Sequence, residues 1–273
     1  MGRGRRAGRN RRRRSRAGAL TLLDDLALAE RAAHAAGELL LDRFGGPARG
    51  LERKSSRTDM VSDADRDAET AIEQVLLGER PDDALIAEEG AHREGVSGRR
   101  WVIDPLDGTT NFLYGFPAWA VSVALEDEDG GAAGVVHDPV RGETFTAARG
   151  LGARLNGEPI RVSEPEKLGA ALVATGFGYD ADRRRTQAEL LVRVLPEVRD
   201  IRRAGAAALD LCWVAAGRLD GYYERGLKPW DWAAGSILVT EAGGALRDLG
   251  GEPSGLVAAG PGIVEELLAL VDG

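Results

Sequence analysis

The chain has 273 residues, 43% of them hydrophobic, which is enough to bury a substantial core in one large domain or two small ones. Residues 1–18 hold nine arginines and no acid, so the rest of the chain carries 27 bases against 44 acids, a net charge of −17. Such a body repels nucleic acid and attracts cations. The single cysteine, Cys212, excludes an internal disulfide, and no apolar run is long enough to span a membrane, so we expect a cytoplasmic protein.

Residues 1–18 predict a disordered tail, because a block of like charges repels itself. The alternative is a basic arm that binds RNA or acidic lipid weakly and in a salt-dependent way. A secretion signal does not fit, since the apolar segment after the arginines is interrupted at Asp24 and Asp25. We therefore expect the folded domain to comprise residues 19–273.

Two helices are expected at the start of this domain. Apolar residues recur every three or four positions over 22–40, the period of an amphipathic helix. A polar loop then leads to a second helix over 64–77, with Ser62 or Asp63 as its N-cap. Asp65 lies in the first turn, where an acid interacts favourably with the helix dipole.

The most informative stretch is 101–112, W-V-I-D-P-L-D-G-T-T-N-F. Its first three residues predict a buried strand that ends at Asp104, because Pro105 lacks the N–H needed for further pairing. Asp104 and Asp107 then converge across a tight turn, and two close carboxylates are costly unless a cation lies between them. The alternative for Asp107 and the glycine after it is an ordinary surface turn.

The next residues, Gly108, Thr109 and Thr110, resemble the opening of a helix. The free N–H groups and the positive dipole end of a helix favour an anion. A metal site and an anion site would thus be adjacent, which is the arrangement that phosphate-ester chemistry needs.

A shorter stretch repeats this pattern. Residues 84–87 predict a buried strand, and Glu88, Glu89 and Gly90 follow it directly. Only a short loop separates this strand from the one ending at Asp104, so we expect the two strand ends to lie side by side. Three carboxylates would then face one cavity.

The middle of the chain predicts an antiparallel meander of strands, with a tight turn at Asn156-Gly157. From residue 171 onward strands alternate with helices, which indicates an α/β second half. Near the end, Pro229 precedes a helix whose first turn contains Asp231 between two tryptophans. Asp231 is either a helix-start acid or, because an unpaired buried carboxylate is expensive, a metal ligand.

Three stretches together resemble the inositol monophosphatase family: I-A-E-E-G at 86–90, the central stretch at 101–112, and W-D-W-A-A-G at 230–235. The similarity runs in order from about residue 20 to the C-terminus. The resemblance implies an α/β layered sandwich of the αβαβα sugar-phosphatase type. It implies an N-terminal α+β half over about 19–165 with an antiparallel sheet, a C-terminal α/β half over about 166–273, and a homodimer.

The resemblance also implies roles for individual residues. Two or three Mg²⁺ ions would be held by oxygen ligands from Glu88, Asp104, the Leu106 carbonyl, Asp107 and Asp231. The attacking water would be oriented and deprotonated by Glu88, Thr109 and Asp65. The substrate would contact Asp107, Gly108, Thr109, Gly205, Ala206, Ala207, Glu224 and Asp231. Lys54 lies on the loop that approaches the metal site in this family.

The implied activity is Mg-dependent, lithium-sensitive hydrolysis of a phosphate monoester by a metal-activated water, with inositol 1-phosphate as the leading substrate. Relatives that act on adenosine 3′,5′-bisphosphate or histidinol phosphate commonly carry lysine where this chain has Thr110, which favours inositol phosphate. Those two esters and fructose 1,6-bisphosphate remain alternative substrates. A non-enzymatic alternative is an RNA-associated protein that binds through the arginine-rich tail.

Overall fold

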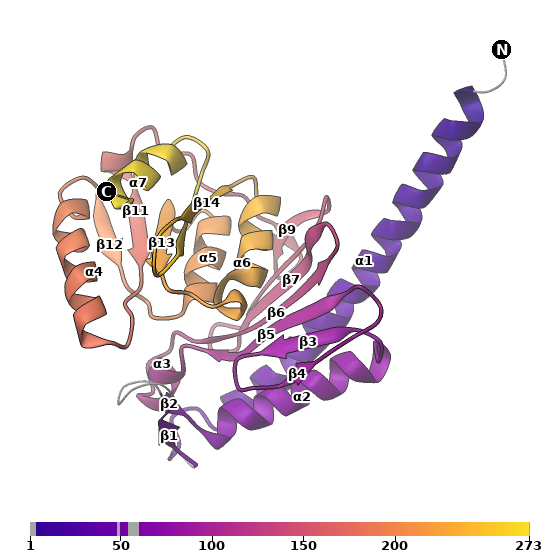
Figure 1. Cartoon of the computed structure of the whole chain (residues 1–273), viewed down its shortest axis with the longest axis horizontal. Helices are drawn as coiled ribbons and strands as arrows, with labels where there is room; N and C mark the ends of the chain where they lie inside the picture. Colours follow the sequence, from indigo (N-terminus) through magenta and orange to yellow (C-terminus); the bar gives the residue numbers. More distant parts are fainter. Residues whose placement is uncertain (1–3, 48–49, 54–59, 273) are drawn as a thin grey trace.

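The computed structural model describes the backbone of residues 4–47, 50–53 and 60–272, and within these ranges the side chains from residue 21 onward, apart from positions 53, 60 and 61. Lys54 lies outside the described residues. Two sheets and three layers of helices alternate to form the expected αβαβα sandwich (Figure 1). Within the described part of the chain, no helix has both the length and the apolar character needed to cross a bilayer.

The larger sheet has eight strands, and its inner strands are the longest. In spatial order they are β10 (Glu158–Pro159), β9 (Gly152–Leu155), β8 (Glu143–Ala148), β7 (Gly130–Asp138), β6 (Ala120–Asp127), β5 (Arg100–Asp107), β3 (Ala84–Ala87) and β4 (His92–Arg93). Neighbours are antiparallel except β3 and β5, which run parallel, so this sheet is mixed rather than wholly antiparallel. The reason is that β4 pairs on one side of β3 before the chain crosses to the other side. A separate small ladder joins β1 (Glu52–Arg53) to β2 (Met60–Val61).

The predicted strand end at Pro105 was wrong. β5 continues through Asp107, and its pairing with β6 shifts register between Asp104 and Asp107. A proline without an N–H is tolerated at such an irregularity, because the ladder is already broken there. Both acids therefore belong to one strand, and the bulge lets them serve the same cavity.

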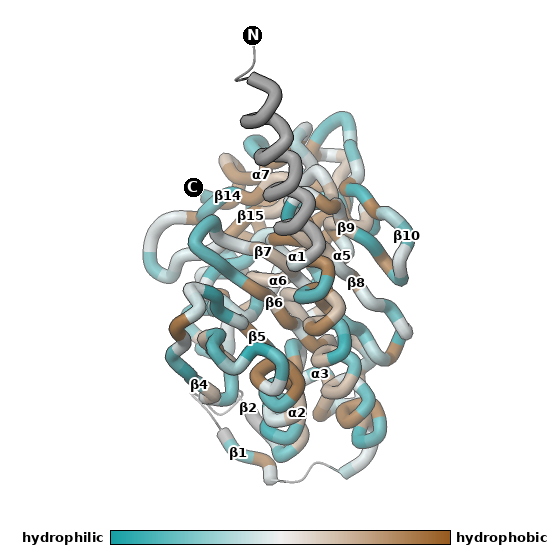
Figure 2. The backbone as a smooth tube through the Cα atoms, turned by 90° about the vertical axis from the view of Figure 1, so that its right-hand side faces the viewer, coloured by the Kyte–Doolittle hydropathy of each residue, from teal (hydrophilic) through white to brown (hydrophobic). Residues whose placement is uncertain are grey.

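Two helices, α1 (Gly4–Leu41) and α2 (Asp63–Glu79), cover the outer face of the large sheet (Figures 1 and 2). α1 begins before the predicted residue 22, and the disorder predicted for residues 1–18 stays a prediction. Its buried face is rich in small side chains that allow close packing on β6 and β7, namely Ala29, Ala32, Ala33 and Ala36. Ser62 caps α2 as expected, in a capping box with Asp65.

The smaller sheet has five strands: β12 (Asp200–Arg202), β11 (Leu172–Thr175), β13 (Gly221–Arg225), β15 (Gly255–Ala259) and β14 (Ala245–Leu249). The first three are parallel, so the loops that follow them leave the same edge. The 3-10 turn η1 (Leu168–Ala170) precedes β11, and the outer layer consists of α4 (Ala181–Val194) and α7 (Val264–Val271).

Between the sheets lie α5 (Ala207–Ala215) and α6 (Pro229–Glu241). α6 packs tightly on β7, since a Cβ added to Gly134 would lie 2.8 Å from the carbonyl oxygen of Ala234. Gly235 likewise gives room to Leu211 of α5. This close packing fixes the start of α6, and with it Asp231, against the large sheet.

A histidine pair joins α1 to β7 of the large sheet. The rings of His34 and His137 stack with their centroids 4.2 Å apart, and both lie within 3.0 Å of the Thr144 hydroxyl. Burial, and then the neighbouring His34, lower the pKa of His137 to about 4, so this ring is neutral near pH 7. These histidines hold the fold together and lie outside the cavity described next.

Candidate functional site

The ends of β3 and β5, the starts of α5 and α6, and the loops after β11, β12 and β13 surround a cavity of about 470 Å³. All but two of the predicted site residues line it: Glu88, Asp104, Leu106, Asp107, Gly108, Thr109, Gly205, Ala206, Ala207, Glu224 and Asp231. Asp65 lies behind this lining, in contact with Thr109. Segments more than 100 residues apart in sequence therefore meet at one place.

Glu88 and Asp104 come from neighbouring parallel strands. Ala87 pairs with Ile103, so the residues that follow them, Glu88 and Asp104, lie side by side, as the sequence predicted. Asp104 is 1% exposed, and its Oδ1 accepts the Leu106 N–H at 3.0 Å. Burial raises the pKa of Asp104 well above its usual value, and the negative charges of Glu88, Asp107 and Asp231 raise it further.

The turn that carries Glu88 is fixed from behind by a residue the sequence analysis did not single out. Glu69 of α2 is buried, and its two carboxylate oxygens accept the N–H groups of Glu89 at 2.8 Å and Ala91 at 2.9 Å. Burial is the main reason that its pKa is raised, and these backbone donors oppose the shift. Glu69 therefore positions the turn without lining the cavity.

Asp107 and Asp231 both contact the start of a helix. Asp107 accepts the Ala208 N–H of α5 at 2.7 Å, and Asp231 accepts the Lys228 N–H at the start of α6 at 2.6 Å. Burial raises the pKa of Asp107 to about 7, although its backbone donors lower it. The pKa of Asp231 is also raised well above its ordinary value, first by burial and then by Asp107 and Glu88.

We name Glu88, Asp104, Asp107 and Asp231 the acidic cluster. Its donor chemistry fits a hard divalent cation, because Mg²⁺ prefers carboxylate and carbonyl oxygens. Among the residues that the structure describes, no three acids, histidines or cysteines form a closed metal cluster, so these four surround the cavity instead of meeting at a point. Burial, and then repulsion from neighbouring acids, raises the pKa values of Asp104 and Asp231, and a bound cation would offset that repulsion.

The helix predicted after the central acids is α3 (Thr109–Leu113), with Gly108 as its N-cap. Gly108 has φ +92°, and a Cβ there would lie 2.9 Å from the Ala118 carbonyl oxygen and 3.3 Å from Ala206 Cβ. A side chain at this position would therefore meet both strain and close contacts. Glycine keeps the first turn of α3 against the cavity.

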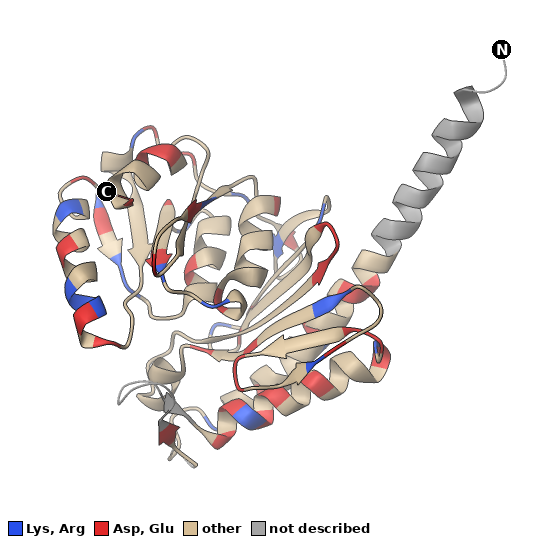
Figure 3. Cartoon of the chain, viewed as in Figure 1, with Lys and Arg blue, Asp and Glu red and all other residues tan. Residues whose placement is uncertain are grey.

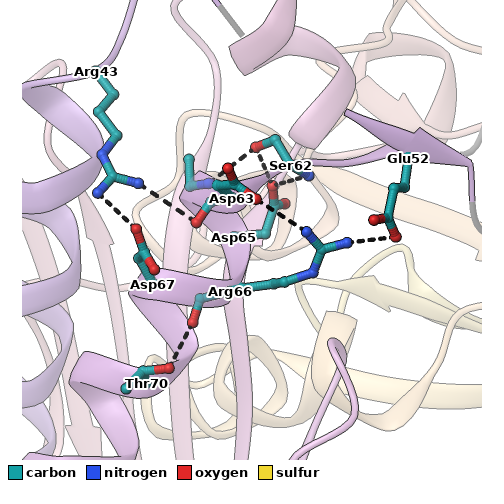
Figure 4. A network of polar contacts seen from close by, with 9 residues as sticks. Arg43, Glu52, Ser62, Asp63, Asp65, Arg66, Asp67 and Thr70 are labelled. Carbon is teal, nitrogen blue, oxygen red and sulfur yellow. Dashed lines mark hydrogen bonds and ion pairs between the residues drawn. The ribbon is translucent and has the colours of Figure 1, made fainter. Parts of the chain in front are cut away.

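Thr109 is linked to the N-terminus of α2. Its hydroxyl lies 3.1 Å from both Asp65 Oδ1 and the Leu106 carbonyl oxygen. The other oxygen of Asp65 accepts the Ser62 N–H at 2.9 Å and the Ser62 hydroxyl at 2.6 Å (Figure 4). Asp65 is fully buried, so this arrangement fixes the orientation of the Thr109 hydroxyl.

The opposite half of the lining comes from the smaller sheet. Because β11, β12 and β13 are parallel, their carboxyl ends meet at one edge, a common place for binding sites in α/β folds. Glu224 near the end of β13 accepts the Tyr222 hydroxyl at 2.7 Å, and burial raises its pKa. This partly buried position distinguishes Glu224 from an ordinary surface acid.

Three charged residues around Glu224 were missed by the sequence analysis. Arg183 from α4 and Arg203 after β12 line the cavity, and both oppose the rise in the pKa of Glu224. Asp210 of α5 is 1% exposed, its Oδ1 has no hydrogen-bond partner, and burial raises its pKa well above normal. We name Glu224, Arg183 and Arg203 the arginine wall.

A second cavity, of about 400 Å³, lies between the end of α1 and the start of α2. Three of its charged lining residues are in ion pairs, since Arg43 contacts Asp67 at 2.7 Å and Asp63 contacts Arg66 at 3.2 Å (Figure 4). None of the predicted site residues within the described part of the chain lines it. We therefore place the functional site in the cavity of the acidic cluster.

Together, the five-layer fold and the carboxylate-lined cavity between its sheets define an α/β protein of the sugar-phosphatase type. The chain belongs to the inositol monophosphatase family, which it matches across residues 23–271. The arginine-rich segment 1–18 lies outside that match. Family membership supports phosphatase activity.

Relatives of known sequence agree with this assignment. An inositol-1-monophosphatase SuhB from Mycobacterium tuberculosis H37Rv is 44% identical over 84% of this chain and 83% of its own length. A protein named Nus factor SuhB from Escherichia coli K12 is 41% identical over 89% of this chain and 94% of its own length.

Solved structures also agree. The extragenic suppressor protein suhB of Bartonella henselae superposes with a TM-score of 0.86 at 39% identity, over 91% of this chain and 98% of that one. An IMPase from Thermotoga maritima gives a TM-score of 0.83 at 34% identity, over 91% and 97% of the two chains. The predicted family and fold are thereby confirmed.

Proposed function

We propose that this chain is a Mg²⁺-dependent phosphatase that hydrolyses inositol 1-phosphate to inositol and phosphate. The observation that carries the proposal is the meeting of four carboxylates, from three separate segments, beside the start of α3 in one cavity. Repulsion among buried carboxylates makes the cavity attractive to a divalent cation, and family membership agrees with a phosphate ester as the substrate.

The acidic cluster and the Leu106 carbonyl would hold two or three Mg²⁺ ions. When bound, Mg²⁺ offsets the negative charge of the ester and makes water a better nucleophile near neutral pH. The N–H groups of Gly108 and Thr109 at the start of α3 would bind phosphate oxygens. A phosphate monoester resists attack mainly because of its own charge, so donors at this place favour the reaction.

The water would be oriented by the Thr109 hydroxyl. Since that hydroxyl is held by Asp65, its oxygen is fixed in direction and accepts a hydrogen bond from the water. Glu88, on the neighbouring strand end, would accept the proton. On the other side of the cavity, Glu224 would accept hydrogen bonds from two hydroxyls of the polyol, with Gly205, Ala206 and Ala207 packing against its ring.

The test is phosphate release from inositol 1-phosphate, fructose 1,6-bisphosphate, histidinol phosphate and adenosine 3′,5′-bisphosphate, with and without Mg²⁺. We expect Mg²⁺-dependent release with preference for inositol 1-phosphate, and loss of that release in Asp104→Asn. Preference for another ester would replace the substrate and keep the metal site. No metal-dependent release from any ester would overturn the enzyme proposal. Adding Li⁺ to the active reaction tests the expected lithium sensitivity.

A second candidate function is suggested by the relatives named Nus factor SuhB. Such a role would use the arginine-rich residues 1–18 to associate with RNA, while the acidic body opposes it. Deleting residues 1–18 should remove salt-sensitive RNA retention and leave turnover unchanged. If the intact chain retains no RNA at low salt, this candidate is excluded. The homodimer and the cytoplasmic location also stay proposals, and sedimentation of the intact chain tests the first.

A further inference from the structure

Glu224 lies near the end of β13, where the smaller sheet supports this strand on one side only. On the β11 side, the backbone pairing of β13 ends with Tyr223. On the β15 side, the pairing continues through Glu224 and Arg225, and Arg225 lies opposite Gly255. The peptide that carries Glu224 therefore has half the strand pairing of the residues before it.

The side chain of Arg225 supplies further contacts for this end of β13. Alternate side chains of a strand point to opposite faces, so Arg225 faces the outer helices, as Tyr223 does, while Glu224 faces the cavity. The Nη1 of Arg225 donates to the Gly250 carbonyl oxygen at 2.5 Å, in the loop between β14 and β15. Its Nη2 donates to Asp272 Oδ1 at 3.2 Å, at the C-cap of α7. One guanidinium group thus joins three elements of the smaller sheet and its outer layer.

The residues next to Arg225 contact the same part of the sheet. The Gly226 N–H donates to the Ser254 carbonyl oxygen at 2.6 Å. A Cβ added to Gly255 would collide with the Glu224 carbonyl oxygen, so β15 approaches β13 closely at this point. From Gly226 the chain continues along the cavity to Asp231 at the start of α6. The loop between β14 and β15 therefore supports the backbone on which Glu224 depends.

Arg225 differs from an ordinary surface ion pair, which contributes little because water screens both charges. Its side chain is 24% exposed, and its shortest contact is with a backbone carbonyl group. Arg247 of β14 provides the comparison. It contacts Glu265 of α7 at 2.7 Å, the two side chains are 41% and 65% exposed, and the pair lies away from the cavity lining.

Building on the proposed function, we propose that Arg225 is a positioning residue: it joins the end of β13 to the β14–β15 loop and to the end of α7, and so fixes the direction in which Glu224 meets the polyol. Arg225 takes no part in binding the phosphate or in the chemical step. Through this contact, Asp272, 47 residues further along the chain, influences recognition of the substrate.

The experiment compares inositol 1-phosphate with 4-nitrophenyl phosphate, a phosphate ester without polyol hydroxyls for Glu224 to bind. In the full chain with Mg²⁺, Arg225→Gln should raise the KM for inositol 1-phosphate about tenfold, the scale of one hydrogen bond to a charged group, with kcat nearly unchanged. Its kcat/KM for 4-nitrophenyl phosphate should equal that of the wild type, because a direction of Glu224 matters only to a polyol.

Two further variants accompany this one. Asp272→Asn leaves the carbonyl contact of Arg225 in place, so it should raise the KM for inositol 1-phosphate by about twofold. This variant decides the inference if Arg225→Gln does not fold. The matched control, Arg247→Gln, breaks a contact between the same sheet and the same helix and should leave this KM unchanged.

Each result decides the inference. An unchanged KM for inositol 1-phosphate in Arg225→Gln overturns it, and so do equal losses on both esters or a control that raises the KM as much. The proposed function is judged separately, by calorimetry with inositol 1-phosphate in EDTA, where turnover is suppressed. A wild type that binds this ester but releases no phosphate with Mg²⁺, with binding about tenfold weaker in Arg225→Gln, would keep the positioning role and lose the phosphatase. A wild type that neither binds nor hydrolyses it would overturn both.

Discussion

The acidic cluster and the arginine wall face one cavity but are built in different ways. Three of the four acids lie within 20 residues of sequence, since Glu88 directly follows β3 while Asp104 and Asp107 belong to the last half of β5. The arginine wall takes single residues from a helix, a loop and a strand of the smaller sheet. Figure 3 shows how the charged residues are distributed over the two sheets and the helices that pack on them.

We expect this difference to separate the reaction from the choice of substrate. Three acids of the cluster, Asp104, Asp107 and Asp231, accept backbone N–H groups at 2.6 to 3.0 Å, which fixes their orientation. Long arginine side chains on loops adapt to different ligands at little cost to the fold. We therefore expect changes in the acidic cluster to affect turnover of every ester, and changes in the arginine wall to affect the choice among them.

The largest effect is expected for Asp104→Asn. Removal of a charge shared by the whole acidic cluster should lower kcat/KM by about a thousandfold or more for every ester, since metal ions contribute several kcal/mol to such reactions. The melting temperature should not fall, because a repulsive buried charge is lost. Asp248→Asn, at an exposed position in β14, is the control for kinetics and melting. Turnover that survives in Asp104→Asn would remove this residue from the reaction.

Gly108→Ala should lower turnover nearly as much, because the added Cβ would lie 2.9 Å from the Ala118 carbonyl oxygen and 3.3 Å from Ala206 Cβ, beside the acidic cluster. Gly115→Ala provides the matched control: its φ is +68°, and an added Cβ has no heavy atom within 4 Å. In urea unfolding we expect a cost of about 1 kcal/mol at Gly115 and about 3 kcal/mol at Gly108, where close contact adds to backbone strain. Equal costs at the two glycines would show that the contact contributes nothing.

Glu224→Gln should weaken substrate binding without slowing the chemical step. An amide keeps the shape of the side chain but offers one acceptor oxygen instead of two, so the KM for inositol 1-phosphate should rise about tenfold while kcat changes little. Glu158→Gln at the edge of the large sheet is the control. If kcat instead falls as steeply as in Asp104→Asn, the division between the two regions is wrong.

A smaller effect is expected from Mg²⁺ on thermal stability. The raised pKa values in the acidic cluster mean that the folded protein holds protons more tightly than the unfolded chain does. Stability without metal should therefore fall as pH rises from about 4 through about 7, the pKa of Asp107. Mg²⁺ competes with these protons, so it should raise the melting temperature by a few degrees at pH 8 and less at pH 5. An equal shift at both pH values would contradict this coupling.

The acidic cluster could be predicted because its signal is local. Asp104 and Glu88 each follow an apolar run directly, Asp107 comes three residues after Asp104, and parallel neighbours place such strand ends side by side. The strand end at Pro105 was predicted wrongly, since a proline rule applied to a regular ladder does not anticipate a bulge. Pairing of β5 with β6 on both sides of the bulge outweighed the local tendency of Pro105 to end the strand.

The arginine wall could not be predicted from local patterns. Arg183 and Glu224 line the same cavity only because β11 lies between β12 and β13, an order that no short motif in the sequence encodes. In α4, the arginines at 183, 184 and 185 read alike, yet only one of them lines the cavity. The burial of Asp210 could not be predicted for a similar reason, because the sequence does not show which elements pack around an acid in an otherwise apolar helix.

The outermost strands of the large sheet are only two residues long, His92–Arg93 on one side and Glu158–Pro159 on the other. Long edge strands present unpaired backbone groups that recruit strands from other molecules, and a proline within the edge lacks the donor for such pairing. The eight- and nine-residue inner strands are thereby shielded from edge-to-edge aggregation. A homodimer of this chain would accordingly be built from side-chain surfaces and not by joining two sheets into one.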